Sequence, residues 1–178
     1  MGAKLLMLLL AIACGPFPAI AGGQGEDGRL VHEGVVAAPL KDVWAAFTTK
    51  EGQESWMVAH SEVELKVGGL MRTHYDPKGT LGDPKTIENT IIAYDPGRML
   101  SIRVTKAPEG FPFPNAVRAM WTVIYFEAAG PQATRVRIVG LGFGADEESK
   151  KMRAFFDRGN AFTLKKLQER FAPKKSDE

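Results

Sequence analysis

The amide of Asn160 is the side chain whose position in the sequence says most about chemistry. Met152, Phe156, Asn160, Thr163 and Leu167 follow one another at steps of three and four residues, so they share one face of a helix. A buried polar group that is left unpaired costs about 1 to 3 kcal/mol. Asn160 therefore has two interpretations: it offers hydrogen bonds to a ligand in a cavity, or it bonds to a strand backbone or a trapped water.

A second set of candidates comes from a predicted strand. Met71, Thr73 and Tyr75 alternate along it and share the face that we expect to turn inward. Such side chains suit an aromatic or lipid-like ligand, and ordinary core packing is the alternative. Trp56 ends a predicted short helix, where it either borders the mouth of a cavity or packs in the core. The candidate ligand-binding residues are therefore Trp56, Met71, Thr73, Tyr75, Phe156, Asn160 and Thr163.

The histidines predict little catalytic chemistry. His74 falls on the opposite side of its strand from Tyr75, which predicts an exposed side chain, and His32 is predicted to lie on the surface of the first strand. No H-x-H or H-E-x-x-H spacing joins His60 and His74 to nearby carboxylates, so we expect neither a metal site nor a cofactor. An enzyme of the cyclase or hydratase type would have to use His74 or Tyr75 as its acid or base.

The first 21 residues resemble a secretory signal peptide. Lys4 provides a positive start, residues 5–13 are apolar, and Ala19-Ile20-Ala21 matches an A-x-A cleavage site. The apolar run is too short to span a bilayer, which takes about 20 residues. We therefore expect no stable membrane span and an exported protein, periplasmic or secreted. The alternative is a lipoprotein anchored through Cys14, because residues 10–14 resemble a lipobox.

Composition limits the classes of function that remain. The chain has 178 residues, and its 23 Lys and Arg against 21 Asp and Glu give a net charge of +2, which argues against nucleic-acid binding. The only cysteine lies in the leader, so thiol catalysis and zinc-thiolate sites are excluded from an exported product. The length predicts one domain at 29–172, after a flexible linker at 22–28 and before a charged tail at 173–178.

Hydrophobic periodicity predicts the elements that must position the candidate residues. Seven strands are expected, at 30–38, 62–67, 70–75, 86–94, 99–105, 119–128 and 134–143. Helices are expected at 40–47, at 51–57 and, with Asp146 as N-cap, at 146–171. We expect Gly159 to let the last helix approach the sheet closely. Because consecutive strands pair antiparallel, this long helix must cover one face of a curved sheet, an α+β arrangement.

This order of elements, together with four short runs, resembles the START-like or Bet v 1-like (SRPBCC) superfamily. The runs are VAAPLKDVWAAF at 36–47, Trp56, VGG at 67–69 and YDPGRML at 94–100. The branch most similar is that of the heat-shock-protein-90 ATPase-activator homologues, although an exported protein would meet neither ATP nor the cytosolic chaperone. The resemblance implies a helix-grip fold, with the sheet wrapped on the C-terminal helix around an internal cavity.

Three functions follow as hypotheses. The first is an exported protein that binds a small apolar or amphipathic molecule, lipid-like or aromatic, under the long helix. The second is an enzyme that uses the same cavity. The third is a module that docks a protein or forms a homodimer through Trp121 and Tyr125, which share the outer phase of a strand that is apolar on both faces. The apolar loop at 107–117 is interpreted as a lid or membrane-touching tip, or as packing over the cavity mouth.

Overall fold

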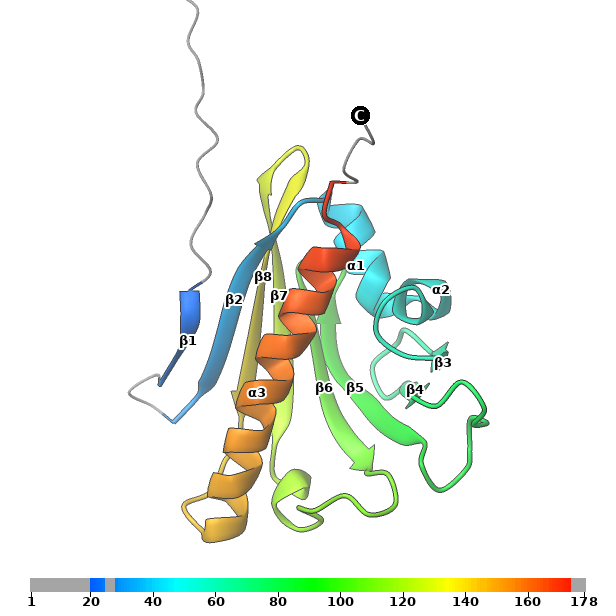
Figure 1. Ribbon diagram of the computed structural model, residues 1–178, viewed down its shortest axis with the longest axis vertical. Coiled ribbons are helices and arrows are strands. Elements are labelled where there is room, and N and C mark those ends of the chain that lie inside the picture. Colours follow the sequence, from blue (N-terminus) through cyan, green and yellow to red (C-terminus); the bar gives the residue numbers. More distant parts are fainter. Residues whose placement is uncertain (1–19, 25–27, 174–178) are drawn as a thin grey trace, which may run out of the picture.

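The structure is a computed structural model that describes residues 20–24 and 28–173, and it contains one antiparallel sheet with a long helix across its concave face (Figure 1). The strands are β1 (Ile20–Gln24), β2 (Leu30–Val36), β3 (His60–Val63), β4 (Leu70–His74), β5 (Ile87–Asp95), β6 (Met99–Lys106), β7 (Trp121–Gly130) and β8 (Ala133–Leu141). Their order across the sheet is β1-β2-β8-β7-β6-β5-β4-β3. The predicted α+β helix-grip fold is confirmed, with β1 as an additional edge strand.

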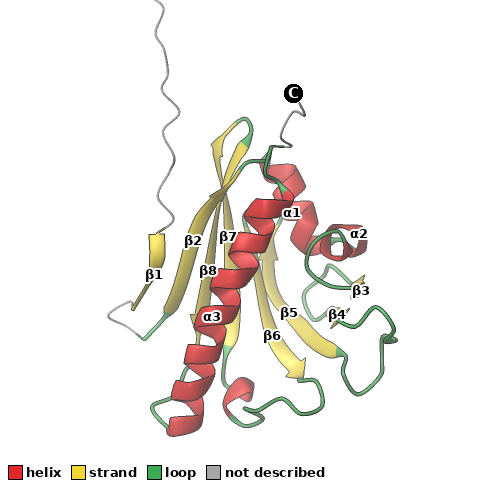
Figure 2. Cartoon of the chain, in the orientation of Figure 1, coloured by secondary structure: helices red, strands yellow, loops and turns green. Residues whose placement is uncertain are grey.

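Two short helices, α1 (Leu40–Thr48) and α2 (Lys50–Glu54), separate β2 from β3, and the long helix α3 (Glu147–Arg170) follows β8 (Figure 2). Strands β3 to β8 follow one another as a meander, and β2 closes the order by pairing with β8 from Leu30↔Gly140 to Val36↔Thr134. This pairing sets α1 and α2 against one end of the sheet. A one-turn 3-10 helix, η1 (Ala116–Arg118), lies in the loop before β7.

The ends of α3 follow from its sequence. The Asp146 carboxylate accepts a hydrogen bond from the Ser149 backbone N–H at 2.9 Å, which caps the first turn. Glu147 and Glu148 lie in that turn and Arg170 lies in the last, so the charges complement the helix dipole at both ends. At 24 residues the helix is about 36 Å long, which is enough to cross the sheet.

Close approach between α3 and the sheet occurs at Gly34 of β2. A Cβ atom at Gly34 would lie 3.0 Å from Gln168 Nε2 and 3.1 Å from Leu164 Cδ2. The Gln168 amide also donates a hydrogen bond to the Val35 carbonyl oxygen at 3.0 Å. The expectation that Gly159 would provide this contact is wrong, because nothing lies within 4 Å of a Cβ built there.

The main core lies between the sheet, α1 and the C-terminal half of α3. Val36, Val43, Ile91, Leu100, Val136 and Leu167 are completely buried in it. Phe126 packs edge-on against Trp44 and Phe47, with ring centroids 5.2 and 5.3 Å apart. A second cluster beneath the N-terminal half of α3 contains Val117, Met120 and Met152. The two clusters leave the middle of the inner sheet face without a packed cover.

Most predicted boundaries lie within two residues of the observed ones, and three differences are larger. Alternation predicts a strand at 62–67, but β3 runs from His60 to Val63 and the chain then turns, leaving Val67 65% exposed. The helix predicted at 51–57 ends at Glu54. The expected linker at 22–28 is a strand at its start, because residues 22–24 belong to β1, which pairs with β2.

The predicted signal peptide and charged tail fall mostly on residues 1–19 and 174–178, which lie outside the described residues. Within residues 20–24 and 28–173, no helix combines the length and the hydropathy needed to cross a bilayer.

Candidate ligand-binding cavity

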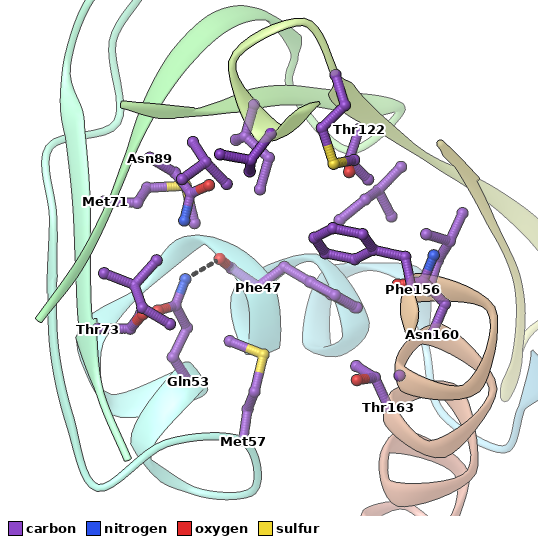
Figure 3. Close-up of a pocket in the computed structure, with 18 of the residues that line it drawn as sticks. Phe47, Gln53, Met57, Met71, Thr73, Asn89, Thr122, Phe156, Asn160 and Thr163 are labelled. Carbon is purple, nitrogen blue, oxygen red and sulfur yellow. Dashed lines mark hydrogen bonds between the residues drawn. The ribbon is translucent and has the colours of Figure 1, made fainter. Parts of the chain in front are cut away.

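A cavity of about 660 Å³ lies between the inner face of the sheet and α3. Its walls come from β4 to β8, from α3, from the end of α1 with α2 and the residues after it, and from the loop between β6 and β7. Figure 3 shows Met71 and Thr73 of β4 on one side of the space, and Phe156, Asn160 and Thr163 of α3 on the other. The volume falls within the range of about 300 to 1,000 Å³ that is typical of small-molecule sites.

The sheet side of the cavity is apolar because inward-facing residues of neighbouring strands lie in register. Leu100 pairs with Ile124, which pairs with Ile138, and Ile102 pairs with Thr122. These side chains line the cavity. A surface of this kind favours an apolar ligand, since burial of apolar area gives roughly 25 cal/mol per Å².

Two amides line this apolar space without a hydrogen-bond partner among the described residues. Asn89 of β5 lies opposite Met71 in the sheet and Asn160 lies on α3, and Figure 3 shows both amides directed toward the cavity. Within the part of the chain that the structure describes, neither side chain forms a hydrogen bond. An unpaired amide next to an apolar pocket gains most from a ligand that carries a hydrogen-bonding group.

Gln53 also lines the cavity, but its amide is occupied. It is completely buried and donates to the Phe47 carbonyl oxygen at 2.6 Å (Figure 3). It also accepts from the Ser61 hydroxyl at 2.6 Å. These bonds join α1, α2 and β3 at one end of the cavity. Gln53 therefore shapes the wall and is not free to bind a ligand through both ends of its amide.

The mouth of the cavity is marked by residues that both line it and are exposed. Tyr75 and Phe162 are each 63% exposed, Phe155 is 41% exposed, and Lys166 is also exposed. Desolvation raises the pKa of the Tyr75 hydroxyl above 10, because the atoms around the phenol exclude part of the water that would stabilise its charged form. Tyr75 is therefore a neutral hydrogen-bond donor at physiological pH.

The loop between β6 and β7 closes the end of the cavity near the start of α3. Phe111 and Phe113 pack edge-on against Phe155, with ring centroids 5.9 and 5.7 Å apart. The Glu148 carboxylate accepts hydrogen bonds from the backbone N–H groups of Asn115 at 2.9 Å and Ala116 at 3.1 Å. These bonds lower the pKa of Glu148 and tie the loop to the first turn of α3. Of the interpretations of this loop, packing over the cavity matches its position.

All seven candidate residues predicted from the sequence lie in the cavity wall. They are Trp56, Met71, Thr73, Tyr75, Phe156, Asn160 and Thr163. Trp56 packs against the main core, as one of its two interpretations had it, and it also lines the cavity while its ring N–H donates to the Ala46 carbonyl oxygen at 3.1 Å. A ligand-binding role for the seven residues stays a prediction.

Asn89 and Gln53 were missed. Asn89 carries a usable signal, because it alternates in phase with Ile87 and Ile91 and so interrupts an inward apolar row. Gln53 carries none, because it lies in the polar run KEGQE, where nothing distinguishes a buried amide from an exposed one.

The prediction that His74 is exposed is wrong. Its side chain is 2% exposed, although it does lie on the face of β4 away from the cavity. The Asp76 backbone N–H donates to His74 Nδ1 at 3.1 Å, and His74 Nε2 lies 3.0 Å from an Asp83 carboxylate oxygen. The loop after β4 folds back over the ring, and alternation along a strand does not reveal such a cover.

Asp83 is held in its ionised form by the same loop. Burial opposes ionisation, but the backbone N–H groups of Thr80 and Lys85, together with His74, outweigh it and lower the pKa of Asp83. The His74 and Asp83 pair thus fixes the loop to the back of β4. It does not contact the cavity.

The prediction that His32 lies on the surface is also wrong. Its side chain is 5% exposed and faces α3, where Nε2 lies 3.0 Å from Asp157 Oδ1. His32 therefore helps to hold α3 on β2. Among the described residues, no three His, Cys, Asp or Glu side chains gather in a group suited to a metal ion.

Comparisons with known proteins agree with this geometry. A sequence model of the family described as polyketide cyclase / dehydrase and lipid transport matches residues 28–172. No curated protein matches the sequence significantly.

Among solved structures, the Aha1 dimer from Colwellia psychrerythraea is similar at 15% identity and a TM-score of 0.62, over 83% of this chain and 98% of that one. The AHSA1-like protein from Aeromonas hydrophila is similar at 17% identity and a TM-score of 0.58, over 80% and 90%. A protein from Arthrobacter aurescens is similar at 15% identity and a TM-score of 0.65, over 88% and 94%. At these identities the likeness shows a shared START-like, or Bet v 1-like, fold.

Proposed function

The chain belongs to the polyketide cyclase / dehydrase and lipid transport family, and from that premise we propose that it is a carrier for one small apolar or amphipathic molecule. The ligand would occupy the cavity beneath α3, with its apolar body against the strands β6 to β8. The family includes both catalysts and carriers by its description, so the choice between them depends on the side chains of this chain.

The observation that carries the proposal is an apolar cavity lined by two amides that have no hydrogen-bond partner in the described part of the chain. Asn89 and Asn160 reach the space from the sheet and from the helix. Each amide has a donor and an acceptor to offer, which would orient a ligand that carries a hydroxyl or carbonyl group. The apolar wall would supply affinity, and the amides would supply selectivity.

The enzyme alternative has less support. His74, the candidate acid or base, lies on the far face of β4 and is engaged by Asp83 and the loop after β4. Tyr75 lies at the mouth, where its raised pKa keeps the hydroxyl protonated and so disfavours it as a base.

Export and self-association remain parts of the proposal with their own support. The leader at 1–21 supports export, with cleavage after Ala21 or lipidation at Cys14 as its two forms. On β7, Tyr125 is 45% exposed, and Arg103 lies over the half-buried Trp121 ring at 5.7 Å, although Trp121 also lines the cavity. These residues mark the surface that a homodimer or docked protein would use.

Native mass spectrometry of protein purified from the exported fraction tests the carrier proposal. We expect a co-purifying mass that disappears on denaturation, and the polypeptide mass then distinguishes a start at Gly22 from a lipidated Cys14. Gly159→Phe is the matched blocking variant, because its ring would extend into the cavity from a position with open space. Ala161→Phe adds the same ring to an exposed position of α3 that does not line the cavity.

The expected result is loss of the co-purifying mass in Gly159→Phe and its retention in Ala161→Phe. An empty wild-type protein that also takes up no added apolar compound would overturn the proposal. A ligand retained equally by both variants would place binding outside the cavity and would overturn it as well.

A further inference from the structure

Lys166 is distinguished by its charge. Among the described residues that line the cavity, it is the one with a charged side chain, and the remainder are apolar or neutral polar. It lies on α3 two turns beyond Gly159, and it is exposed at the mouth. A cavity whose wall carries one positive charge at its opening has an electrostatic preference that its apolar interior does not provide.

Among residues 20–24 and 28–173, the ammonium group of Lys166 has no acidic partner within ion-pair distance. In the part of the chain that the structure describes, it forms no ion pair, whereas the adjacent Lys165 lies 3.9 Å from Glu169. Lys166 Nζ lies 5.8 Å from the centre of the Phe162 ring, which is also at the mouth. This contact with the ring leaves the three N–H donors available to another group.

Tyr75 adds a second donor from the other side of the opening. It reaches the mouth from the end of β4, whereas Lys166 reaches it from α3. The Tyr75 hydroxyl has no hydrogen-bond partner among the described residues, and desolvation raises its pKa so that it keeps its proton. Two exposed lining residues, one a cation and one a neutral donor, thus have no acceptor among the described residues, which favours an anionic group at the exposed edge of the cavity.

We propose that the ligand is an amphipathic acid, with an apolar body inside the cavity and one anionic group at the mouth beside Lys166. This inference rests on the proposed carrier function and narrows its ligand class. The neutral amides of Asn89 and Asn160 would bind uncharged polar groups along the body. A cationic amphiphile of the same length is disfavoured, since its head would meet the Lys166 ammonium.

The size of the expected effect follows from exposure. An ion pair at an exposed position gives about 0.2 to 1 kcal/mol, which corresponds to an affinity change of up to roughly fivefold. Lys166→Met keeps most of the apolar stem and removes the charge. Lys165→Met is the matched control, because it removes one charge from the next residue, which does not line the cavity.

The experiment measures displacement of the neutral dye Nile red from the full exported protein by oleate, oleyl alcohol and oleylamine. These compounds share one chain and differ in the charge of the head. We expect oleate to bind more tightly than the alcohol, and the amine to bind least tightly. Lys166→Met should lower the affinity for oleate by roughly two- to fivefold and leave the affinity for the alcohol unchanged, whereas Lys165→Met should change neither affinity. Dodecyl phosphate then separates a general preference for anions from one for carboxylates.

Each outcome decides between the two proposals. Equal affinity for oleate and the alcohol, with no effect of Lys166→Met, would overturn the amphipathic acid and leave the carrier function intact. Equal losses of oleate affinity in Lys166→Met and Lys165→Met would also overturn it, because the preference for oleate would then come from the net charge of the protein and not from the cavity mouth. Failure of all three compounds to bind, together with an empty protein in native mass spectrometry, would overturn the carrier function and the inference with it.

Discussion

The backbone of Gly79 packs against the His74 ring so closely that a Cβ atom added to Gly79 would overlap that ring. This contact explains how a histidine on the outer face of β4, one strand in from the edge of the sheet, becomes buried. The loop that contains Gly79 is the cover, and the Asp83 carboxylate fastens it to His74 Nε2 at 3.0 Å.

We therefore expect Gly79→Ala to destabilise the protein. The methyl group has no space, and forced overpacking of this kind costs about 1 to 3 kcal/mol. Urea unfolding gives the free energy directly. Gly159→Ala is the contrasting variant, because its Cβ meets nothing within 4 Å and the helix gains up to about 1 kcal/mol when alanine replaces glycine. Equal effects of the two substitutions would contradict the packing described for both glycines.

The link between Glu148 and the loop before β7 predicts a dependence of stability on pH. Hydrogen bonds from Ala116 and Asn115 lower the pKa of Glu148 below 4.5 in the folded protein. A lowered folded pKa stabilises the protein above the unfolded value, and this stabilisation is lost as the pH falls through the folded value. We expect the free energy of unfolding of wild type to fall more steeply between pH 5 and pH 3 than that of Glu148→Gln.

Glu147→Gln is the control for that series, because Glu147 bonds to Lys150 on the helix surface and not to the loop. Its pH profile should follow wild type in this range. Faster release of a bound compound is also expected from Glu148→Gln, measured by stopped-flow dilution, since the loop forms part of the cavity wall. Identical pH profiles for all three proteins would rule out the proposed link.

Asn160, whose amide forms no hydrogen bond among the described residues, and Gln53, whose amide forms two, predict opposite effects of substitution on stability. Asn160→Leu should leave the free energy of unfolding within about 1 kcal/mol of wild type, because no protein hydrogen bond is lost and leucine favours the helix. Gln53→Leu should destabilise by about 1 to 3 kcal/mol for each partner that it strands, Phe47 and Ser61. Urea unfolding of both variants checks this, and a large loss in Asn160→Leu would show that its amide is structural.

The Tyr75 hydroxyl is predicted to ionise above pH 10. In an alkaline titration, the phenolate absorbance of wild type and of Tyr75→Phe is measured against pH. The difference between the two curves should show one transition, with a midpoint above pH 10. A bound apolar compound should move the midpoint higher, because it excludes more water from the phenol. A difference transition at or below pH 10 would mean that the hydroxyl faces open solvent.

Much of the fold could be predicted because the short-range signals in the sequence agree with the tertiary structure. The Asp146 cap, the Asp95-Pro96-Gly97 turn and the alternation of β4 to β8 each act over a few residues, so the sequence reports them directly. Gly97 has a φ of 72°, as expected for that turn. The helix-grip arrangement then follows, because a meander with one apolar face needs one long amphipathic helix to cover it.

The wrong predictions occur where a segment from elsewhere in the sequence determines whether a side chain is buried. Alternation assigns His74 to the outer face, but a loop that begins two residues later covers it. His32 lies in a strand that could have been exposed, but α3 brings Asp157 to it from 125 positions away in the sequence. The expectation for Gly159 is wrong for the same reason, since periodicity identifies a helix face without saying which part of the sheet it meets, and the close approach occurs at Gly34.

The two long faces of α3 also have different roles in the structure. Met152, Leu164, Leu167 and Gln168 attach the helix to the sheet and the loop before β7, whereas Phe156, Asn160, Thr163 and Lys166 face the cavity. Phe156 contributes to both faces, because it also packs against the cluster around Met152. Asn160, Thr163 and Lys166 belong to neither core cluster, so mutations there that alter which molecule is accepted need not loosen the scaffold. Divergence within such a lineage can therefore proceed one side chain at a time along a single helix, and a library restricted to those three positions is a direct route to altered selectivity.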